Sequence, residues 1–350
     1  MKIKLKNIKI SHIIAGLPKK KISVHDFEPL FGKKQVERIS NSTGIEYVHY
    51  AEDDLCASDY GVILAQKLME ETELSGKDFD GIVFISQTPD YIMPATSVIM
   101  QDRLGLPKTS VAFDINSGCN GYVYGLYQAS LLISSGSCKR VLLFNGDTKS
   151  RLVYEKDRTT RMVMGDGFSV TLIIQGNDEL CFNIHSDGNS LDHVLLENGG
   201  ARHAKSLNDG DSFTDDIGYI HYPNYIFMNG MKMMNFILDN VPNLIKETLE
   251  FVGWSKEDVG AYAMHQVNQM ILKTLSEKLE IPLDHMPIAL KDMGNTGSAS
   301  VPLMLSMKHK ELEEQKLLSK VMICGYGIGL SWGAVALDLS ETMIHDTLTI

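Results

Sequence analysis

The residue best placed to do chemistry is a single cysteine beside a predicted turn. Cys119 follows a short apolar run, Val111–Ile115, and precedes a helical pattern of apolar residues that extends to Ser135. Unpaired backbone N–H groups at the start of a helix carry partial positive charge, which favours a thiolate and can hold a developing oxyanion. The sequence therefore predicts that Cys119 is a nucleophile presented to an acyl group.

The alternative is that Cys119 is a small buried hydrophobe, which is the commoner fate of a free cysteine. Glycines at positions 118, 121 and 125 favour the catalytic interpretation, because they let the backbone approach a ligand closely. A catalytic cysteine also needs a base and a second stabilising group elsewhere in the chain.

Two side chains in the second half of the chain could meet that need. His265 follows a short apolar run in the sequence MHQVN, and a neutral imidazole can accept a thiol proton or hydrogen-bond a thioester carbonyl. A surface or capping histidine is the alternative. Asn295 lies in the loop MGNTGSASVP, where its amide could share an oxyanion with His265. The alternative is an ordinary turn asparagine.

A glycine-rich turn, Gly325–Gly333, could add backbone donors. Its sequence, GYGIGLSWG, brings N–H groups close to a bound group, and the N–H of Ile328 could face the same carbonyl as the N–H of Cys119. A tight β-turn without a ligand is the alternative.

The elements that must position these residues alternate between strands and helices, which predicts a mainly parallel sheet with helical layers. The predicted strands are Met1–Ile14, Gly81–Ser86, Val111–Ile115, Arg140–Gly146, Met164–Gln175, Asp258–Met264 and two within Val321–Leu339. The predicted helices are Asp53–Glu71 with Asp54 as its cap, Pro94–Leu104, the one after Cys119, Asn229–Phe251, Asn268–Leu279 and one at the end of Asn295–Leu312. Between the halves, Asp187–Tyr225 is a long polar insertion, and loops of that length are often functional.

A weak internal repeat suggests two similar halves. Gly165–Ser169 and Gly327–Ser331 have similar sequences, GDGFS and GIGLS, and each leads into an apolar strand. Such similarity indicates a duplicated unit. The predicted division is an N-terminal half, residues 1–175, that carries the cysteine, and a C-terminal half, residues 176–350, that carries the histidine and asparagine.

Composition restricts the function classes. The 350 residues carry a net charge of −11, which disfavours a nucleic-acid partner. No apolar run approaches the roughly 20 residues of a membrane span, and the five cysteines lack metal-ligand spacing, which fits a cytoplasmic protein. The basic segment Lys149–Arg161 is either a docking patch for an acidic partner or a solvated loop.

Four segments together resemble the signatures of one enzyme family. DINSGCNGYVYGL, MHQVN, MGNTGSASVPL and GYGIGLSWGAVAL are similar, in this order, to those of the β-ketoacyl-acyl-carrier-protein synthase III family of the thiolase superfamily. The resemblance runs nearly end to end. It implies an α/β thiolase-like fold of five layers, αβαβα, internally duplicated, in a homodimer that requires no metal or cofactor. It also implies an acyltransferase of fatty acid or lipid biosynthesis.

The resemblance also implies a role for each catalytic residue. Cys119 takes an acyl group from an acyl thioester, and the backbone N–H groups of Cys119 and Ile328 form the oxyanion hole. His265 and Asn295 stabilise the carbanion formed when a malonyl group on acyl carrier protein loses CO₂. The carbanion attacks the acyl-enzyme and releases a β-ketoacyl thioester.

The expected substrate-binding positions depart from the family pattern. Arg158 matches an arginine that stacks on the adenine of coenzyme A, but Arg38 and Ser42 stand where relatives that use coenzyme A have a tryptophan and an arginine. The acyl donor is therefore either acyl-coenzyme A or acyl carrier protein.

Four further positions are expected near the substrate. Asn268 ends the histidine motif, and Met270 replaces a basic residue that contacts carrier protein in relatives. Met231 lies near the expected path of the pantetheine arm, and Met93 replaces an aromatic residue given to the partner subunit's acyl pocket. These changes indicate a secondary-pathway member with a recast substrate tunnel.

Two other functions remain open at this point. The same cysteine could pass an acyl group to a hydroxyl or amine without decarboxylation, although Asn295 argues against this because decarboxylation is the step that needs both donors. The chain could also be a non-catalytic partner of another synthase.

Overall fold

The computed structural model describes residues 1–208, 210–215, 218 and 220–350. Its strands are β1 (Lys2–Leu17), β2 (Lys20–Ser23), β3 (Tyr47–Tyr50), β4 (Gly81–Ile85), β5 (Val111–Ile115), β6 (Arg140–Asp147), β7 (Gly167–Ser186), β8 (Val194–Leu196), β9 (Phe213–Thr214), β10 (Ile220–His221), β11 (Ile226–Met228), β12 (Tyr262–Met264), β13 (Val321–Gly327), β14 (Ser331–Leu337), β15 (Met343–Ile344) and β16 (Leu348–Thr349). Its α-helices are α1 (Glu28–Phe31), α2 (Lys33–Thr43), α3 (Ala57–Thr72), α4 (Thr96–Arg103), α5 (Gly121–Ser134), α6 (Gly230–Val252), α7 (Gln269–Leu279), α8 (Leu290–Met293) and α9 (Ser300–Glu314).

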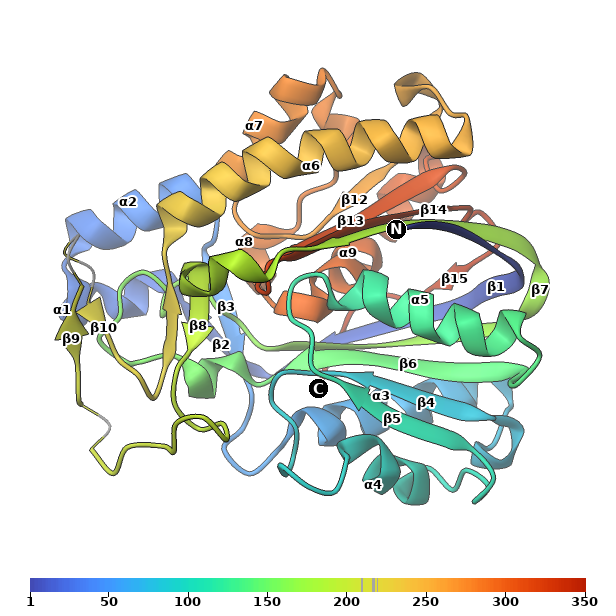
Figure 1. The fold of residues 1–350 in the computed structure, drawn as a ribbon, viewed down its shortest axis with the longest axis horizontal. Helices are drawn as coiled ribbons and strands as arrows, with labels where there is room; N and C mark the ends of the chain where they lie inside the picture. Colours follow the sequence, from blue (N-terminus) through green and yellow to red (C-terminus); the bar gives the residue numbers. More distant parts are fainter. Residues whose placement is uncertain (209, 216–217, 219) are drawn as a thin grey trace.

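The main body consists of five layers. From top to bottom, Figure 1 shows α6 and α7, then β12 to β14, then α5 and α9, then β4 to β6, and finally α3 and α4. Helices α5 and α9 have apolar side chains that pack against both sheets, including Leu126, Ala129, Leu303 and Leu305, all fully buried. The five-layered αβαβα arrangement expected from the sequence is therefore confirmed.

The strand pairing repeats between the two halves. In the first half β4 and β6 are parallel, β6 and β7 are antiparallel, and β7 and β1 are antiparallel. In the second half β12 and β13 are parallel, β13 and β14 are antiparallel, and β14 and β7 are antiparallel. This repeat agrees with the duplication inferred from sequence.

The prediction of a mainly parallel sheet is wrong. No crossover helix follows β6 or β13 among the described residues, and without one a strand can only return antiparallel to its predecessor. The glycine-rich segments that suggested the repeat are the points where the chain makes these returns.

Strand β7 belongs to both halves of the sheet. Its residues 167–174 pair with β6, and its residues 181–186 pair with β14. The boundary predicted between residues 175 and 176 lies inside this strand, at the change of partner. The division into residues 1–175 and 176–350 as separate units stays a prediction.

The predicted helices are present, with shifted ends. Helix α3 begins at Ala57 and not near Asp54, because its cap is Cys56, whose N–H donates to the Asp59 carboxylate at 2.6 Å. In the central layer, α5 begins two residues after Cys119, and α9 begins five residues after Asn295. The starts of the two central helices therefore bring both residues to the middle of the molecule.

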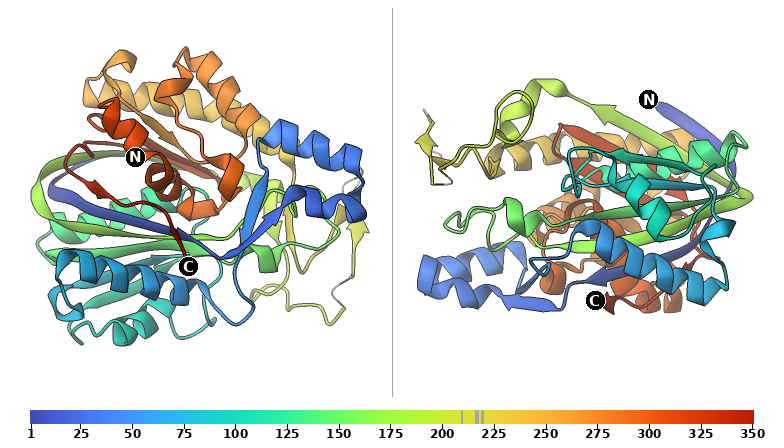
Figure 2. Two further views of the ribbon diagram at one scale, coloured as in Figure 1. Left: turned by 180° about the vertical axis from the view of Figure 1, so that it is seen from behind. Right: turned by 90° about the horizontal axis from the view of Figure 1, so that it is seen from below.

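The predicted polar insertion, Asp187–Tyr225, forms short strands away from the layers. Strands β9 and β10 project from the same end of the body as α1 and α2 (Figures 1 and 2). Positions 209, 216, 217 and 219 of this insertion lie outside the described residues. No helix within the described ranges is both long enough and apolar enough to cross a membrane.

Candidate active site

Residues from the four segments singled out in the sequence line one cavity. Cys119, His265, Asn295 and Ile328 all line it, although they come from the starts or ends of β5, β12, α8 and β13. Its volume is about 50 Å³. Most of the remaining wall is apolar, with side chains such as Met164, Ile237 and Val267. The cavity therefore places a thiol and several polar donors in a small apolar site.

Cys119 is half-buried at the turn between β5 and α5, as the sequence predicts. Burial raises the pKa of its thiol, but the charge and hydrogen bond of the neighbouring His265 lower it. The Lys149 ammonium and a hydrogen bond from the Ile328 N–H lower it further, so that the pKa falls from 9.0 to about 6. Cys119 is therefore mainly a thiolate at neutral pH.

His265 is held rigidly beside Cys119. Its backbone N–H donates to the Cys324 carbonyl at 2.8 Å, and its carbonyl accepts from the Tyr326 hydroxyl at 3.1 Å. Its ring Nδ1 lies 2.6 Å from Ser300 Oγ, which also accepts from the Gln266 N–H at 3.4 Å.

This hydrogen-bond pattern favours one tautomer of His265. When the Ser300 hydroxyl donates its hydrogen to Nδ1, the ring hydrogen of neutral His265 lies on Nε2. Nε2 is buried, and apart from its interaction with the Cys119 thiol it has no partner among the residues that the structure describes. It is therefore available as a donor to a group bound in the cavity.

Asn295 presents its amide to the same cavity. The residue is 3% exposed, and its Oδ1 accepts from the Gly297 N–H at 3.1 Å. Its backbone is fixed by bonds to Val163 and Gly165 on both sides of the Met164 bridge. With Oδ1 occupied, the Nδ2 donor of Asn295 remains for a ligand.

The turn between β13 and β14 lies against the nucleophile. A Cβ atom at Gly327 would be 2.6 Å from Cys119 Cβ and 2.8 Å from Cys119 Sγ, so only glycine allows this approach. The approach brings the Ile328 N–H to the cysteine sulfur. The Ile328 N–H is thus close to the Cys119 sulfur, and an oxyanion hole formed with the Cys119 N–H stays a prediction.

A larger outer cleft adjoins this cavity. It has a volume of about 590 Å³, is lined by Lys156 and Arg158, and shares Ile226 and Met228 with the wall of the inner cavity. Arg158, predicted as a substrate contact, therefore lines a cleft that adjoins the cavity of Cys119.

The other predicted substrate positions do not line either space. Arg38 and Ser42 are exposed on α2, and the Ser42 hydroxyl donates to the Ile39 carbonyl at 3.0 Å. Asn268 caps α7, with its side chain accepting from the Ile271 N–H at 2.8 Å. These side chains are bound within their own helices or face solvent.

Three predicted methionines are also on the surface. Met93 is 79% exposed in the loop before α4, Met231 is 65% exposed on α6, and Met270 is 47% exposed on α7. The structure does not bring them into the cavity of this chain. Their expected roles in binding carrier protein or the partner subunit stay predictions.

Sequence reasoning missed several residues of the cavity, above all Lys149. The segment Lys149–Arg161 was considered either a surface patch or a solvated loop, and both interpretations are wrong for Lys149, which is 4% exposed and faces the cavity. Arg151 is also engaged, donating to the carbonyls of Glu52, Asp53 and Leu55. Gln87 and Ser300 were missed as well, and only their closeness to predicted turns could have suggested them.

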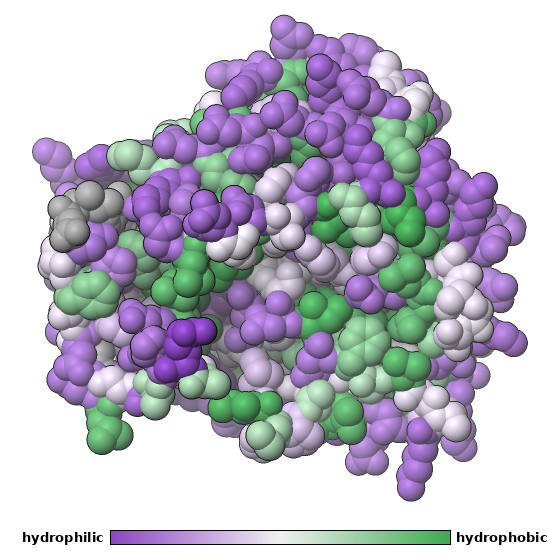
Figure 3. All heavy atoms as spheres, viewed as in Figure 1, coloured by the Kyte–Doolittle hydropathy of each residue, from purple (hydrophilic) through white to green (hydrophobic). Residues whose placement is uncertain are grey.

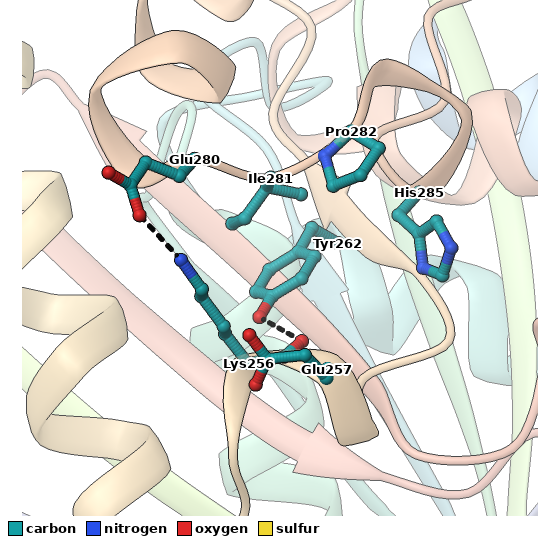
Figure 4. Close-up of a pocket in the computed structure, with 7 residues that line it drawn as sticks. All are labelled: Lys256, Glu257, Tyr262, Glu280, Ile281, Pro282 and His285. Carbon is teal, nitrogen blue, oxygen red and sulfur yellow. Dashed lines mark hydrogen bonds and ion pairs between the residues drawn. The ribbon is translucent and has the colours of Figure 1, made fainter.

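A second depression lies on the outer surface, between β12 and the end of α7 (Figure 4). Its volume is about 230 Å³, and it shares no described lining residue with the cavity of Cys119. Lys256 pairs there with Glu280 at 2.8 Å, and the Tyr262 hydroxyl donates to the Lys256 carbonyl at 3.0 Å. Because these polar groups are already satisfied, this depression is not a candidate active site.

Comparisons with known proteins agree with this geometry. Residues 113–188 match the family model of 3-oxoacyl-[acyl-carrier-protein (ACP)] synthase III, and residues 249–339 match the model of its C-terminal part. A putative 3-oxoacyl-[acyl-carrier-protein] synthase 3 of Campylobacter jejuni is 31% identical over 99% of this chain and 98% of its own. A β-ketoacyl-[acyl-carrier-protein] synthase III of Clostridium perfringens is 33% identical over 87% of this chain and 90% of its own.

Solved structures give the same result for the fold. A 3-oxoacyl-(acyl-carrier protein) synthase from Burkholderia xenovorans LB400 superposes with a TM-score of 0.92, at 30% identity over 100% of this chain and 99% of that one. FabH from Pseudomonas aeruginosa PAO1 has a TM-score of 0.79, at 26% identity over 96% of this chain and 98% of that one. The thiolase-like fold expected from the sequence is therefore confirmed.

Proposed function

The chain belongs to the 3-oxoacyl-[acyl-carrier-protein] synthase III family of condensing acyltransferases, and on that premise we propose that it joins an acyl group to a malonyl-derived carbon. The observation that carries the proposal is the convergence of a low-pKa thiol, an imidazole donor and an amide donor in one cavity. The thiolate can attack an acyl carbonyl, and the imidazole and amide can donate hydrogen bonds to an enolate oxygen.

In the first step Cys119 is acylated. Its thiolate attacks the carbonyl carbon of an acyl thioester, and the N–H groups of Cys119 and Ile328 hold the tetrahedral oxyanion. The intermediate collapses with cleavage of the bond to the donor sulfur. The departing thiolate takes the proton that His265 holds when Cys119 is ionised, so that His265 is neutral in the acyl-enzyme.

In the second step a malonyl thioester loses CO₂. The bond between its α carbon and its carboxylate breaks, and the electron pair passes into an enolate, whose oxygen accepts hydrogen bonds from His265 Nε2 and Asn295 Nδ2. Neutral donors lower the energy of this enolate without protonating its carbon. The α carbon then attacks the acyl carbonyl, the carbon–sulfur bond to Cys119 breaks, and a β-ketoacyl thioester leaves.

The malonyl group is carried by acyl carrier protein in this proposal. The names of the relatives include acyl carrier protein, and the outer cleft lined by Arg158 and adjoining the cavity of Cys119 supports an approach of the carrier arm from this side. The acyl donor uses the same path, bound to coenzyme A or to carrier protein. No metal or cofactor enters either step as proposed.

The proposed assembly is a homodimer formed through the face that contains β5. Strand β5 is the last strand of the sheet. In the loop before α4, Tyr91, Ile92 and Met93 have exposed fractions of 63%, 89% and 79%. Figure 3 shows hydrophobic side chains gathered over α5, β5 and the loop that leads to α4. Sedimentation of the wild type as a dimer, and of Ile92→Asp as a monomer, would support this interface, whereas a monomeric wild type would contradict it.

Transfer of the acyl group to a hydroxyl or amine acceptor is the competing function. It requires Cys119 but not the amide of Asn295, which is the feature that favours condensation. The variant Asn295→Ala therefore separates the two possibilities.

The experiment measures acylation and product formation in the same samples. We expect Asn295→Ala to become acylated at Cys119 nearly as fast as the wild type, and to lose at least about a hundredfold in β-ketoacyl formation from malonyl-carrier protein, in line with the loss of one oxyanion-type donor. A wild type that is acylated but releases no CO₂ from malonyl-carrier protein would favour the competing function.

A further inference from the structure

Lys149 is an unusual residue for the wall of an apolar cavity. It lies in the 3-10 turn Lys149–Leu152 that follows β6, is 4% exposed, and lines the cavity together with Cys119 and Asn295. Burying an ammonium group costs free energy unless its hydrogens are bonded. The hydrogen-bond partners of the Lys149 ammonium therefore indicate which kind of ligand atom the cavity could bind.

Among the described residues, Lys149 has one carboxylate partner, and the contact is loose. Asp147 Oδ2 lies 3.6 Å from Lys149 Nζ, which is an ion pair but too long for a hydrogen bond. An ammonium has three N–H donors, and none of those of Lys149 bonds to another described residue at ordinary distances. Asp147 Oδ2 likewise has no hydrogen-bond partner within the described chain.

Gly297 leaves room for the Lys149 ammonium beside the loop that carries Asn295. A Cβ atom at Gly297 would lie 2.1 Å from Lys149 Nζ, so any other residue at this position would displace the lysine. Gly297 also donates to Asn295 Oδ1. The ammonium is thereby held close to the segment that presents Asn295.

A second polar group faces the same space. Gln87 lines the cavity. Its Oε1 would be 2.6 Å from a Cβ atom at Gly118, the residue before Cys119. The Gln87 N–H donates to Asp147 Oδ1 at 2.5 Å, and Ser86 Oγ donates to the same oxygen at 3.0 Å. Asp147 therefore acts as a positioning residue for both Gln87 and Lys149.

The charges of the cavity restrict the ligand that these groups can bind. Lys149 and Asp147 together are neutral, and acylation of Cys119 removes the thiolate charge. A carboxylate on the acyl group would then be a buried negative charge without a counter-ion of its own, whereas an alkyl chain would leave the ammonium hydrogens unpaired. An uncharged oxygen accepts from the ammonium without either penalty.

The malonyl carboxylate is a poor candidate for the same position. A cation bound to that carboxylate stabilises the ground state more than the transition state, in which the negative charge moves to the enolate, and so would slow the loss of CO₂. The oxygen that Lys149 binds therefore belongs to the acyl group on Cys119.

We propose, resting on the condensing function proposed above, that Lys149 and Gln87 make this enzyme selective for short acyl groups that carry a hydroxyl or carbonyl oxygen, over unsubstituted chains of equal length. The small cavity agrees with this. At about 10–15 Å³ for each water-sized group, its 50 Å³ accommodates only a few such groups.

The test compares acylation rates with thioesters of nearly equal size. Butyryl, β-hydroxybutyryl, acetoacetyl and succinyl groups are offered on coenzyme A and on carrier protein, and intact mass measures acylation of Cys119. We expect the wild type to accept β-hydroxybutyryl and acetoacetyl roughly tenfold faster than butyryl, the cost of one unpaired buried donor, and succinyl more slowly than either.

Three variants separate recognition from a general loss of activity. Lys149→Met should slow acylation overall and reverse the preference toward butyryl, so that the ratio of rates is the readout. Asp147→Asn combined with Lys149→Met should give the same reversed ratio in a cavity without an unpaired carboxylate. Lys77→Met, at an exposed lysine in the turn before β4, should keep the wild-type ratio.

Each outcome discriminates between claims. A wild type that prefers butyryl, or a Lys149→Met variant with an unchanged ratio, would overturn the selectivity. Fastest acylation by succinyl would also overturn it and would indicate an anionic substrate. No acylation by any thioester would overturn the proposed function itself, and the selectivity with it.

Discussion

Replacement of His265 by alanine should shift the ionisation of Cys119 to higher pH. The charge and hydrogen bond of His265 are the largest of the influences that lower the pKa of this thiol, which together bring it from 9.0 to about 6. A group with a lowered pKa is ionised above that value, so the wild-type thiolate predominates from about pH 6 upward. In His265→Ala it should predominate only at a pH closer to 9.

The size of the effect follows from the two pKa values. A thiol with a pKa of about 6 is roughly nine-tenths ionised at pH 7, whereas one with a pKa of 9 is ionised to about one part in a hundred. Burial, which is the largest influence and raises the pKa, remains in the variant, as do Lys149 and the Ile328 N–H, which lower it. The thiolate population at pH 7 should therefore fall by roughly tenfold or more.

Alkylation by iodoacetamide between pH 5 and 9 measures this population, because only the thiolate reacts appreciably. Peptide mass spectrometry assigns the reaction to Cys119, and Cys119→Ser supplies the background rate. The buried thiols of Cys138, Cys181 and Cys324 have pKa values raised by burial, to about 11 for Cys181, and should contribute little. A wild-type midpoint near pH 9, or the same midpoint in His265→Ala, would refute the reasoning.

Three further substitutions test the support around the site. Gly327→Ala places a methyl group 2.8 Å from Cys119 Sγ and should slow acylation at least about a hundredfold, measured by intact mass, with unchanged melting temperature excluding misfolding. Ser300→Ala removes the 2.6 Å partner of His265 Nδ1 and should reduce condensation by roughly tenfold while acylation changes less; equal losses would contradict the tautomer assignment. Asp166→Ala removes a fully buried carboxylate that accepts three hydrogen bonds and should destabilise the fold by about 3 kcal/mol or more in urea unfolding; a change below about 1 kcal/mol would contradict this.

The sequence was sufficient to predict the parts of the site that follow strand ends. Cys119, His265 and Ile328 follow apolar runs, so local pattern placed each of them after a strand. Strands β5 and β12 lie at opposite ends of the strand order, so the expectation that these residues meet came from the resemblance to the family. The fold class was predictable from the alternation of strands and helices. Their catalytic roles stay predictions until they are measured.

The direction of strand pairing was not predictable from local pattern. An apolar run such as Met164–Gln175 has the same appearance whether its neighbour is parallel or antiparallel, and the direction depends on whether a helix precedes it. The run also continues as β7 to Ser186, because its second half pairs with a strand that comes 145 residues later in the chain, at Ser331.

Lys149 shows a different limit of sequence reasoning. A lysine in a polar segment normally faces solvent, and nothing in its immediate neighbours indicates burial. Its position depends on Asp147 for charge and on Gly297 for space, and the glycine is far away in the sequence. The roles of Arg38, Met231 and Met270 rest on the resemblance alone, and because these side chains are exposed in a single chain they stay predictions.

The measurement that tests the central claim most directly follows a single acyl group through both steps. Purified enzyme is acylated with an isotopically labelled acyl thioester, freed of excess donor, and mixed with malonyl-carrier protein. We predict that the label leaves Cys119 and appears in a β-ketoacyl group on the carrier protein, with one CO₂ released for each label transferred. Label that stays on Cys119 while CO₂ is released, or label that leaves as a free acid or an ester, would contradict the account.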